Sequence, residues 1–148
     1  MAVIVVGVDG SEASKEALRW AIDEAELRTA TLRAVHAWTY PPIFGEAYVV
    51  PEALGPNWLR DQAQQRLDDV VAEVAGRNPH AYIEPVVREG PAAQVLIDVA
   101  RDADLLVVGS RGHGGFAGLL LGSVSQQCAQ HAPCAVTIVR AQHEQSAE

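Results

Sequence analysis

Glycine and serine gather in one short stretch of the chain, GSRGHGGFAGLLLGSVSQQ at residues 109–127. The stretch follows the apolar run LLVV and precedes a segment with helical spacing, so it predicts a loop between a strand and a helix. Glycine lets a ligand approach the backbone closely, and the start of a helix presents free N–H groups and a partial positive charge. A phosphate group suits such a loop, with the hydroxyls of Ser123 and Ser125 as further donors.

Two common phosphate-binding motifs are absent from the chain. The only lysine, Lys15, lies far from the glycine-rich stretch, so the pattern Gly-x-x-x-x-Gly-Lys-Ser/Thr does not occur. The first turn after a strand, GVDGS at residues 7–11, lacks the Gly-x-Gly-x-x-Gly fingerprint of dinucleotide-binding oxidoreductases. Residues 105–143 contain no Asp or Glu but include Arg111 and Arg140, and this distribution favours an anionic ligand near the loop.

Short apolar runs alternate with longer segments of helical periodicity along the chain. This alternation is typical of repeated strand–helix units and a parallel sheet. The runs predict five strands, at residues 2–8, 31–38, 81–87, 105–109 and 135–140. Pro85 lies within the third run, and because proline has no N–H to donate, we expect that strand at an edge of the sheet.

Cap and turn residues predict four helices between these strands. Ser11 is expected to cap the first helix, and Gly76 to end the second. Pro91 suits the first turn of the third helix, and Ser123 is expected to cap the fourth. The remaining long connection, residues 39–57, is rich in proline and glycine, so we expect a long loop there that could serve as a lid.

Asp9 follows the first predicted strand, just as the glycine-rich loop follows the fourth. In an open parallel sheet, ligands bind beyond the carboxyl ends of the strands. If the first and fourth strands are neighbours, Asp9 faces the loop across that edge of the sheet. The alternative is that Asp9 only caps the first helix or forms a turn. Likewise, Arg111 and His113 could be solvated loop side chains.

Length and composition exclude several classes of protein. The chain has 148 residues, of which 49% are hydrophobic and 20% charged, so we expect one soluble domain at residues 1–141 and a polar tail at residues 142–148. No apolar run approaches the roughly 20 residues that span a membrane, and the N-terminal run lacks the features of a signal peptide, so we expect a cytoplasmic protein. A net charge of −8 argues against nucleic acid as a partner.

Three other features have ordinary structural explanations. Cys128 and Cys134 are expected to be small buried hydrophobic residues rather than a redox pair. His36 lies in a predicted strand and is expected to be a core histidine. The second helix carries an acidic cluster that is expected to face solvent, formed by Asp68, Asp69 and Glu73.

The spacing Gly109-x-x-Gly112, nine residues, then Gly122-Ser123 resembles the motif of the nucleotide-binding branch of the universal stress protein family. The resemblance extends over nearly the whole chain, through VGVDGSEAS near the start, EGPAAQVLIDVARDADLLVVGSRGHGG in the middle and LLLGSVSQQCAQHAPCAVTIVR at the end. It implies a Rossmann-like α/β fold, in which a single domain forms an open five-stranded parallel sheet of order 3-2-1-4-5 with helices on both faces. Ala135 departs from the pattern, because the family commonly has proline before the last strand.

The resemblance also implies the residues of a nucleotide site. By position, Asp9 lies close to the nucleotide and its metal ion, and the backbone of Ala37 addresses the adenine edge. The phosphates and ribose are held by the residues of the motif, Gly109, Gly112, Gly122 and Ser123. The predicted binding set is completed by Ser11, Val108, Arg111, Val124 and Ser125.

Three functions are compatible with these residues. The first is a regulatory module that binds ATP with Mg²⁺ or Mn²⁺, although the sequence leaves open whether ATP, AMP or a cyclic nucleotide is preferred. The second is an ATPase or nucleotidyl transferase, which we expect to be slow because phosphoryl transfer needs a basic clamp and a positioned base. The third is a nucleotide-free dimeric stress protein that acts through protein partners, and the intact glycine motif argues against it. We expect a homodimer through the last strand, residues 135–140, because an apolar edge strand is usually paired or covered.

Overall fold

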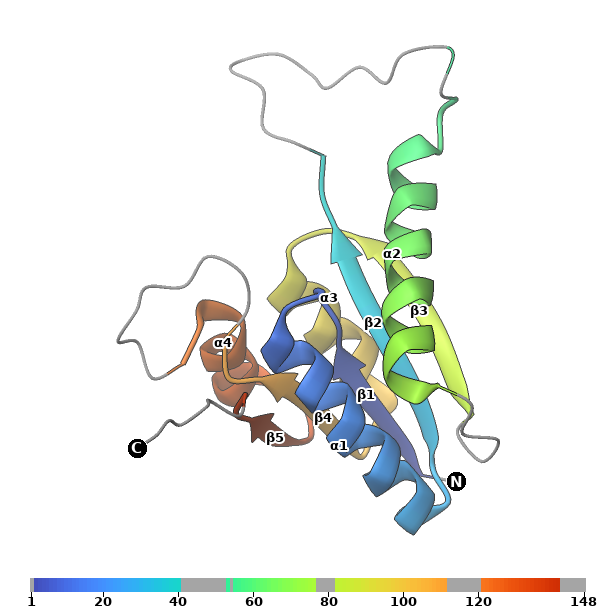
Figure 1. Ribbon diagram of the computed structural model, residues 1–148. Helices are drawn as coiled ribbons and strands as arrows, with labels where there is room; N and C mark the ends of the chain where they lie inside the picture. The colour runs from blue at the N-terminus through green and yellow to red at the C-terminus, as the bar shows by residue number, and fades with distance from the viewer. Residues whose placement is uncertain (1, 41–52, 54, 77–81, 112–120, 142–148) are drawn as a thin grey trace, which may run out of the picture.

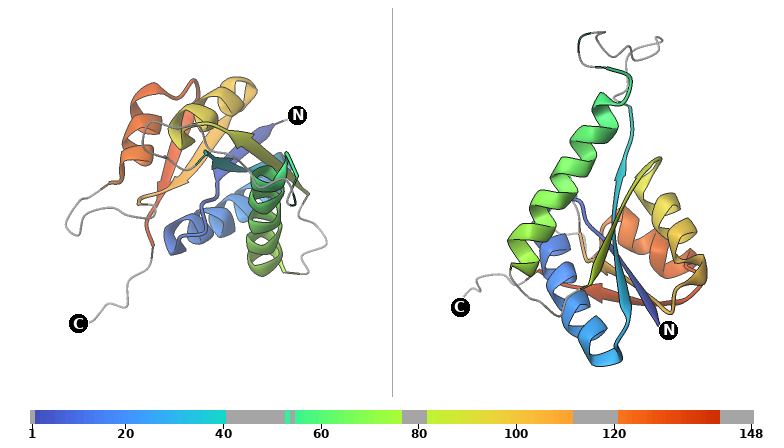
Figure 2. Two further views of the ribbon diagram at one scale, coloured as in Figure 1. Left: turned by 90° about the horizontal axis from the view of Figure 1, so that it is seen from above. Right: turned by 90° about the vertical axis from the view of Figure 1, so that its right-hand side faces the viewer.

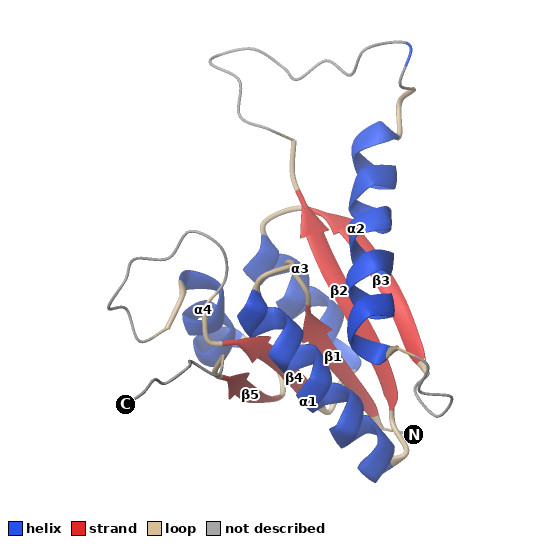
Figure 3. Cartoon of the chain, in the orientation of Figure 1, coloured by secondary structure: helices blue, strands red, loops and turns tan. Residues whose placement is uncertain are grey.

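The computed structural model describes residues 2–40, 53, 55–76, 82–111 and 121–141. They form one α/β domain built on a parallel sheet (Figures 1 and 3). The strands, in chain order, are β1 (Val3–Gly7), β2 (Thr31–Trp38), β3 (Ile83–Glu89), β4 (Leu105–Gly109) and β5 (Ala135–Val139). They lie in the order β3-β2-β1-β4-β5, which confirms the predicted fold class and strand order.

The described helices cover both faces of this sheet, α1 and α2 on one and α3 and α4 on the other (Figure 2). The helices are α1 (Glu12–Arg28), α2 (Trp58–Ala75), α3 (Ala92–Val99), which continues into a short 3-10 helix, and α4 (Ser123–His131). Side chains of β1 alternate between the faces: Ile4 and Val6 pack with α1 and α2, whereas Val5 packs with α3 and α4. None of the described helices is long and apolar enough to cross a membrane.

β3 lies at an edge of the sheet, as Pro85 predicted. Pro85 is in register with Ala34 of β2, so one side of the strand is paired, and its other side has no neighbouring strand among the described residues. The strand ends at Glu89 rather than at residue 87. Gly90 ends it with a φ of +140° and donates its N–H to the Trp38 carbonyl over 2.8 Å.

Two of the four predicted helix-end residues are confirmed. The Ser11 hydroxyl accepts a hydrogen bond from the Ser14 N–H over 3.2 Å at the start of α1. Gly76 ends α2 in the left-handed region, with a φ of +60°, and its N–H donates to the Ala72 carbonyl over 3.0 Å. These two ends follow from local chemistry, because the partner lies within four residues in each case.

The other two predictions are wrong by one residue. Pro91 occupies the N-cap position of α3, just before the first turn, and has an extended ψ of 137°. α4 is capped by Gly122, so Ser123 is the first residue inside the helix. A cap residue keeps an extended backbone, and Gly122 does so, with φ −76° and ψ 171°.

The two cysteines are free, and the prediction that they are small buried residues is confirmed for Cys128 alone. Cys128 is fully buried between α4 and the sheet, and this burial raises the pKa of its thiol to about 11. Cys134 is partly buried, and burial raises its pKa as well. Because the thiolate is the reactive form, these raised pKa values make both side chains poor nucleophiles.

Candidate functional site

An open hollow lies at the carboxyl ends of β1, β2 and β4. It encloses about 520 Å³, part of which is continuous with solvent. The chain leaves β1 for α1 on one face of the sheet and leaves β4 for α4 on the other face. The hollow therefore lies where neighbouring connections diverge, which is the usual ligand-binding position of open parallel sheets.

One part of the hollow is apolar. Val35 and Ala37 of β2 and Ala92 and Leu96 of α3 line it. Leu96 packs directly over Gly7 of β1, where an added Cβ would lie only 2.9 Å from Leu96 Cδ1. A flat apolar ring suits such a wall, because small-molecule sites are mostly apolar with a few placed polar groups.

β2 extends past the end of β1, so its last residues border the hollow. The pairing of the two strands ends at Gly7 and Val35, and the Val8 N–H donates to the Val35 carbonyl over 2.8 Å. Because every second residue of a strand turns its backbone groups to the same side, Ala37 directs its N–H and C=O toward this side too. These groups lie beyond the last residue of β1, at the edge of the hollow.

Gly109, at the end of β4, is needed for the packing of α1. A Cβ at this position would lie 2.7 Å from the carbonyl carbon of Ala13 and 2.8 Å from its oxygen. Backbone atoms cannot turn aside as a flexible side chain can, so any larger residue would push α1 away from the sheet. Gly109 also lines the hollow, but its lack of a side chain is explained by the helix rather than by a ligand.

The two ends of the connection from β4 to α4 are joined by hydrogen bonds. The Gly122 N–H donates to the Ser110 carbonyl over 2.7 Å, and the Ser110 N–H donates to the Val139 carbonyl over 2.8 Å. The hydroxyl of Ser125 is 2.9 Å from the Ser110 carbonyl oxygen and 3.0 Å from that of Gly122, and the residue is only 2% exposed. The Ser125 hydroxyl therefore holds the ends of this connection together, rather than facing a ligand as its sequence position suggested.

The start of α4 supplies hydrogen-bond donors beside the hollow. The N–H groups in the first turn of a helix have no acceptor within the helix. The Gly122 N–H already donates to the Ser110 carbonyl. The N–H groups of Ser123, Val124 and Ser125 remain. Val124 and Ser125 line the hollow together with Arg111, so donors and one guanidinium meet at this end.

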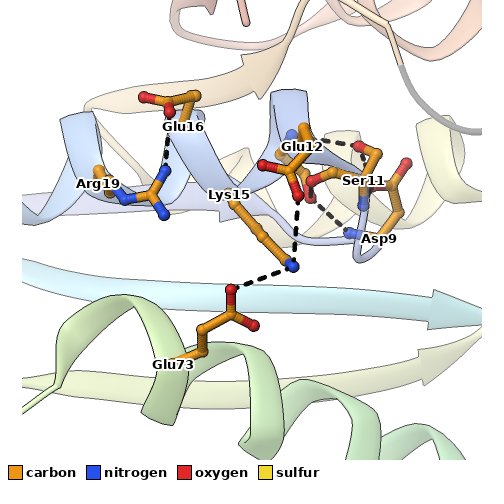
Figure 4. A network of polar contacts seen from close by, with 8 residues as sticks. Asp9, Ser11, Glu12, Lys15, Glu16, Arg19 and Glu73 are labelled. Carbon is orange, nitrogen blue, oxygen red and sulfur yellow. Dashed lines mark hydrogen bonds and ion pairs between the residues drawn. The ribbon is translucent and has the colours of Figure 1, made fainter.

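Asp9 forms a tight turn between β1 and α1 (Figure 4). Its Oδ1 accepts hydrogen bonds from the N–H of Ser11, over 2.8 Å, and from the Ser11 hydroxyl. The Asp9 N–H donates to the Ser14 hydroxyl over 3.2 Å, and Gly10 follows with a φ of +85°. Asp9 is thus a turn residue, as the alternative proposed, and it also lines the hollow.

His36 borders the hollow from the end of β2. Its Nδ1 lies 2.8 Å from the Val8 carbonyl oxygen. Since a carbonyl can only accept, Nδ1 carries the hydrogen, and in the neutral ring Nε2 is left as an acceptor. His36 and Asp9 also border a second hollow, next to α2, which Arg66 and Asp69 line as well. His36 is therefore a half-buried residue at the site rather than part of the core.

The family of the chain follows from its sequence as a whole. The model of the universal stress protein family matches residues 1–140. The chain belongs to the universal stress protein family. Universal stress protein Rv2623 of Mycobacterium tuberculosis is 42% identical over 142 residues, which make up 94% of this chain and 45% of that protein. The chain spans about half the length of the curated relatives it matches.

Solved structures of the family share this fold. A universal stress protein in complex with cAMP has a TM-score of 0.65 and 28% identity, over 95% of this chain and 98% of that one. A universal stress family protein from Arabidopsis thaliana, with AMP bound, has a TM-score of 0.63 over 100% of this chain and 97% of that one. At 18% identity, the second likeness shows the fold alone.

Most of the predicted site residues of this universal stress protein lie together. Those that line the hollow are Asp9, Ala37, Val108, Gly109, Arg111, Val124 and Ser125. Ser11 is bonded to Asp9, and Gly122 and Ser123 begin α4, but these three are not among the lining residues. Gly112 and His113 lie outside the described residues.

Sequence reasoning missed seven of the residues that line the hollow of this universal stress protein: Gly7, Val8, Ser14, Val35, His36, Ala92 and Leu96. A signal existed for Val35 and His36, because they precede Ala37 at the end of a predicted strand. Ala92 and Leu96 are four residues apart at the start of α3, so they share one helix face. That this face turns toward the hollow could not be inferred without the packing of α3 on β1.

Lys15 is held away from the hollow by two carboxylates (Figure 4). Its Nζ lies 3.2 Å from a Glu73 oxygen on α2 and 3.6 Å from a Glu12 oxygen on α1. The hydrogen bond to Glu73 raises the pKa of Lys15, with smaller contributions from the charges of both carboxylates. The acidic cluster faces solvent as predicted, and Glu73, whose side chain is 55% exposed, in addition pairs with a lysine of another helix.

Proposed function

We propose that this universal stress protein is a regulatory module that binds an adenine nucleotide, and that ATP enters as its Mg²⁺ or Mn²⁺ complex. The observation that carries the proposal is the hollow at the ends of β1, β2 and β4, which joins an apolar wall to the start of α4 and to Arg111. A nucleotide needs this combination, because its base is flat and apolar while its phosphates are anionic. The family protein solved with cAMP supports the proposal.

The adenine ring occupies the apolar part of the hollow in this proposal. Val35 and Leu96 form its wall, and the backbone of Ala37 meets the polar edge of the base. A backbone N–H and C=O on the same side of a strand match the neighbouring acceptor and donor of adenine. This arrangement supports the role of Ala37 that the family resemblance implies.

The phosphates lie at the start of α4 in this proposal. Among the described residues, the proposed donors are the N–H groups of Ser123, Val124 and Ser125, the Ser123 hydroxyl and the Arg111 guanidinium. Charge-assisted hydrogen bonds contribute roughly 1.5–3 kcal/mol each, whereas the helix dipole adds about 0.3–1 kcal/mol. Direct hydrogen bonds therefore dominate the binding of phosphate.

Asp9 is the proposed protein ligand of the metal ion. Among the described residues, no group of three or more His, Cys, Asp or Glu side chains could hold a metal by itself. Mg²⁺ is commonly bound through one or two carboxylates, phosphates of the substrate and several waters, so a single carboxylate fits an ion that arrives with ATP. The metal would neutralise charge on the phosphates and link them to the turn after β1.

Binding rather than catalysis is the proposed role. Transfer of a phosphoryl group needs strong charge neutralisation and a positioned base or water. Among the described residues that line the hollow, Arg111 is the only guanidinium, and Lys15 is held by Glu12 and Glu73. A steady-state ATPase rate of about 1–10³ per second that is lost in Asp9→Ala would overturn this part of the proposal.

We propose a homodimer through the last strand, residues 135–140. β5 is an edge strand, and Val136 and Ile138 are only partly buried. An apolar edge with free backbone groups is usually paired or covered. Equilibrium sedimentation that finds a monomer at micromolar concentration would contradict the dimer without affecting the nucleotide site.

The direct test of the proposed function is the small-molecule content of the purified protein. We expect denaturation to release an adenine nucleotide that mass spectrometry identifies, or calorimetric titration of ligand-free protein to show binding of Mg-ATP. Absence of binding under all conditions would instead favour a nucleotide-free stress protein that acts through protein partners.

A further inference from the structure

The second hollow lies between the turn after β1, the end of β2 and α2. It encloses about 790 Å³, part of which is continuous with solvent. Val8, Leu67 and Val70 give it an apolar wall, and a few polar side chains complete its lining. Small-molecule sites commonly combine such a wall with a few polar groups and measure roughly 300–1,000 Å³, so this hollow can hold a small ligand.

Two opposite charges of α2 line this hollow without pairing. Arg66 and Asp69 are both exposed, and they form no ion pair with one another. The same spacing of three residues does close an ion pair on α1, where Arg19 lies 2.8 Å from Glu16. There the acid precedes the base, which is the better order along a helix, whereas α2 has the reverse order. Both charges of α2 are therefore open to a ligand.

The side chains of the second hollow offer one guanidinium and two acceptors. Arg66 makes no hydrogen bond within the part of the chain that the structure describes. Asp69 accepts one at Oδ1, from the Gln65 amide over 2.8 Å, and its Oδ2 has no partner among the described residues. His36 adds Nε2, an acceptor in the neutral ring, because its Nδ1–H is directed to the Val8 carbonyl. A donor with positive charge thus shares one hollow with two acceptors.

We propose that the second hollow binds a small zwitterion with an apolar part, the simplest kind being an α-amino acid such as leucine. Its carboxylate pairs with Arg66, its ammonium group donates to Asp69 and His36, and its apolar part packs on the wall. A zwitterion satisfies both charges of α2 at once, whereas an ion of one sign is attracted by one of them and repelled by the other. Asp9 also lines this hollow, but its Oδ1 is bonded to Ser11 within the turn.

Titration of isotope-labelled protein with leucine, followed by two-dimensional NMR, tests the proposal. We expect the backbone amide signals of His36, Arg66 and Asp69 to shift, with a dissociation constant of about 1 mM or tighter for a ligand of this size. Isocaproate lacks the ammonium group and isoamylamine lacks the carboxylate, so each should bind at least about tenfold more weakly. No binding of leucine at about 10 mM would overturn the site. Equal binding of either analogue would overturn the recognition of a zwitterion.

Substitutions on α2 locate the binding. Arg66→Gln and Asp69→Asn should each weaken leucine binding at least about tenfold, because each removes one of the two charges. The matched controls, Arg60→Gln and Asp68→Asn, remove the same charges at exposed positions of α2 that do not line the hollow. Asp68 also accepts a hydrogen bond from a glutamine four residues earlier, as Asp69 does. An equal loss in the controls would overturn the site.

The nucleotide site is tested separately. Arg66 and Asp69 line the second hollow and not the first. A failure of leucine binding therefore leaves the proposed nucleotide function standing, and a failure of nucleotide binding leaves the second site standing.

Discussion

The connection from β4 to α4 is held differently at its two ends. At the β4 end, Gly109 is required by shape, because Ala13 of α1 leaves no room for a Cβ. At the α4 end, Gly122 has a backbone conformation open to any residue, and hydrogen bonds to Ser110 and Ser125 hold it in place. Packing against α1 thus explains the glycine at position 109, whereas Gly122 is explained only by the proposal that its lack of a side chain leaves space for the ligand.

The largest expected effect is on nucleotide binding, at the α4 end of the connection. Gly122 is buried, but its φ of −76° and ψ of 171° suit valine, so Gly122→Val introduces no backbone strain. Its side chain would occupy the space proposed for the phosphates, and loss of two charge-assisted hydrogen bonds would cost about 3–6 kcal/mol of binding free energy. Calorimetry with Mg-ATP measures the binding, and far-UV circular dichroism shows whether the variant is folded. A folded variant with the parent's affinity would remove Gly122 from the phosphate site.

At the packing end, the expected effect is on stability. Gly109→Ala should lower the free energy of unfolding by about 2–3 kcal/mol, because the new methyl group would meet backbone atoms of Ala13. The matched control is Gly7→Ala, where the close atom is Cδ1 of the flexible Leu96 side chain, so the loss should be smaller. Urea unfolding of both variants gives the comparison. Equal losses would show that the contact with α1 is not special.

A smaller effect is expected at the hydrogen bonds that join the two ends. Ser125→Ala should cost about 1 kcal/mol in the free energy of unfolding, because the buried hydroxyl is bonded to the Ser110 and Gly122 carbonyls. Ser123→Ala is the control, since it removes a hydroxyl from an exposed residue at the start of the same helix. We expect it to weaken nucleotide binding and leave thermal unfolding nearly unchanged. If Ser123→Ala instead lowered the stability and Ser125→Ala left it unchanged, both roles would be wrong.

The smallest effect is expected far from this connection. Two oxygens of Asp102 accept from the Arg33 guanidinium at 2.8 Å and 3.1 Å, and this hydrogen bonding, with the Arg33 charge, lowers the pKa of Asp102 below 3.8. The stabilisation is therefore present above pH 3.8 and is lost as the pH falls through the lower pKa of the folded state. Asp102→Asn should be slightly less stable at neutral pH and converge with the parent in acid. A difference in stability between variant and parent that is the same at all pH values would contradict this. Nucleotide affinity should not change.

Much of the fold could be predicted because its signals are local. Apolar runs bounded by turns mark the strands, and Ser11 and Gly76 end helices through partners a few residues away. Pro85 placed β3 at an edge because proline lacks an N–H. The errors at Pro91 and Ser123 were of one residue, since several neighbours can start a helix and local preference hardly separates them.

The candidate site was predicted less completely. Asp9, Arg111 and Val124 could be named from motif positions, and they do line the hollow. His36 was missed, because its role depends on the Val8 carbonyl of a neighbouring strand. The Ser125 hydroxyl was expected at the ligand and is instead bonded to backbone carbonyls, one of which, that of Ser110, is distant in sequence.

The sequence by itself determined the alternation of strands and helices, the edge position of β3 and the membership of the family, because periodicity, proline chemistry and a long motif can all be read along one chain. Only the tertiary structure showed why position 109 must be glycine, which ring nitrogen of His36 faces the Val8 carbonyl, and that Lys15 pairs with Glu73. Each of these depends on atoms brought together from distant segments. Their separation is set by how helices pack on the sheet, and no local pattern encodes that distance.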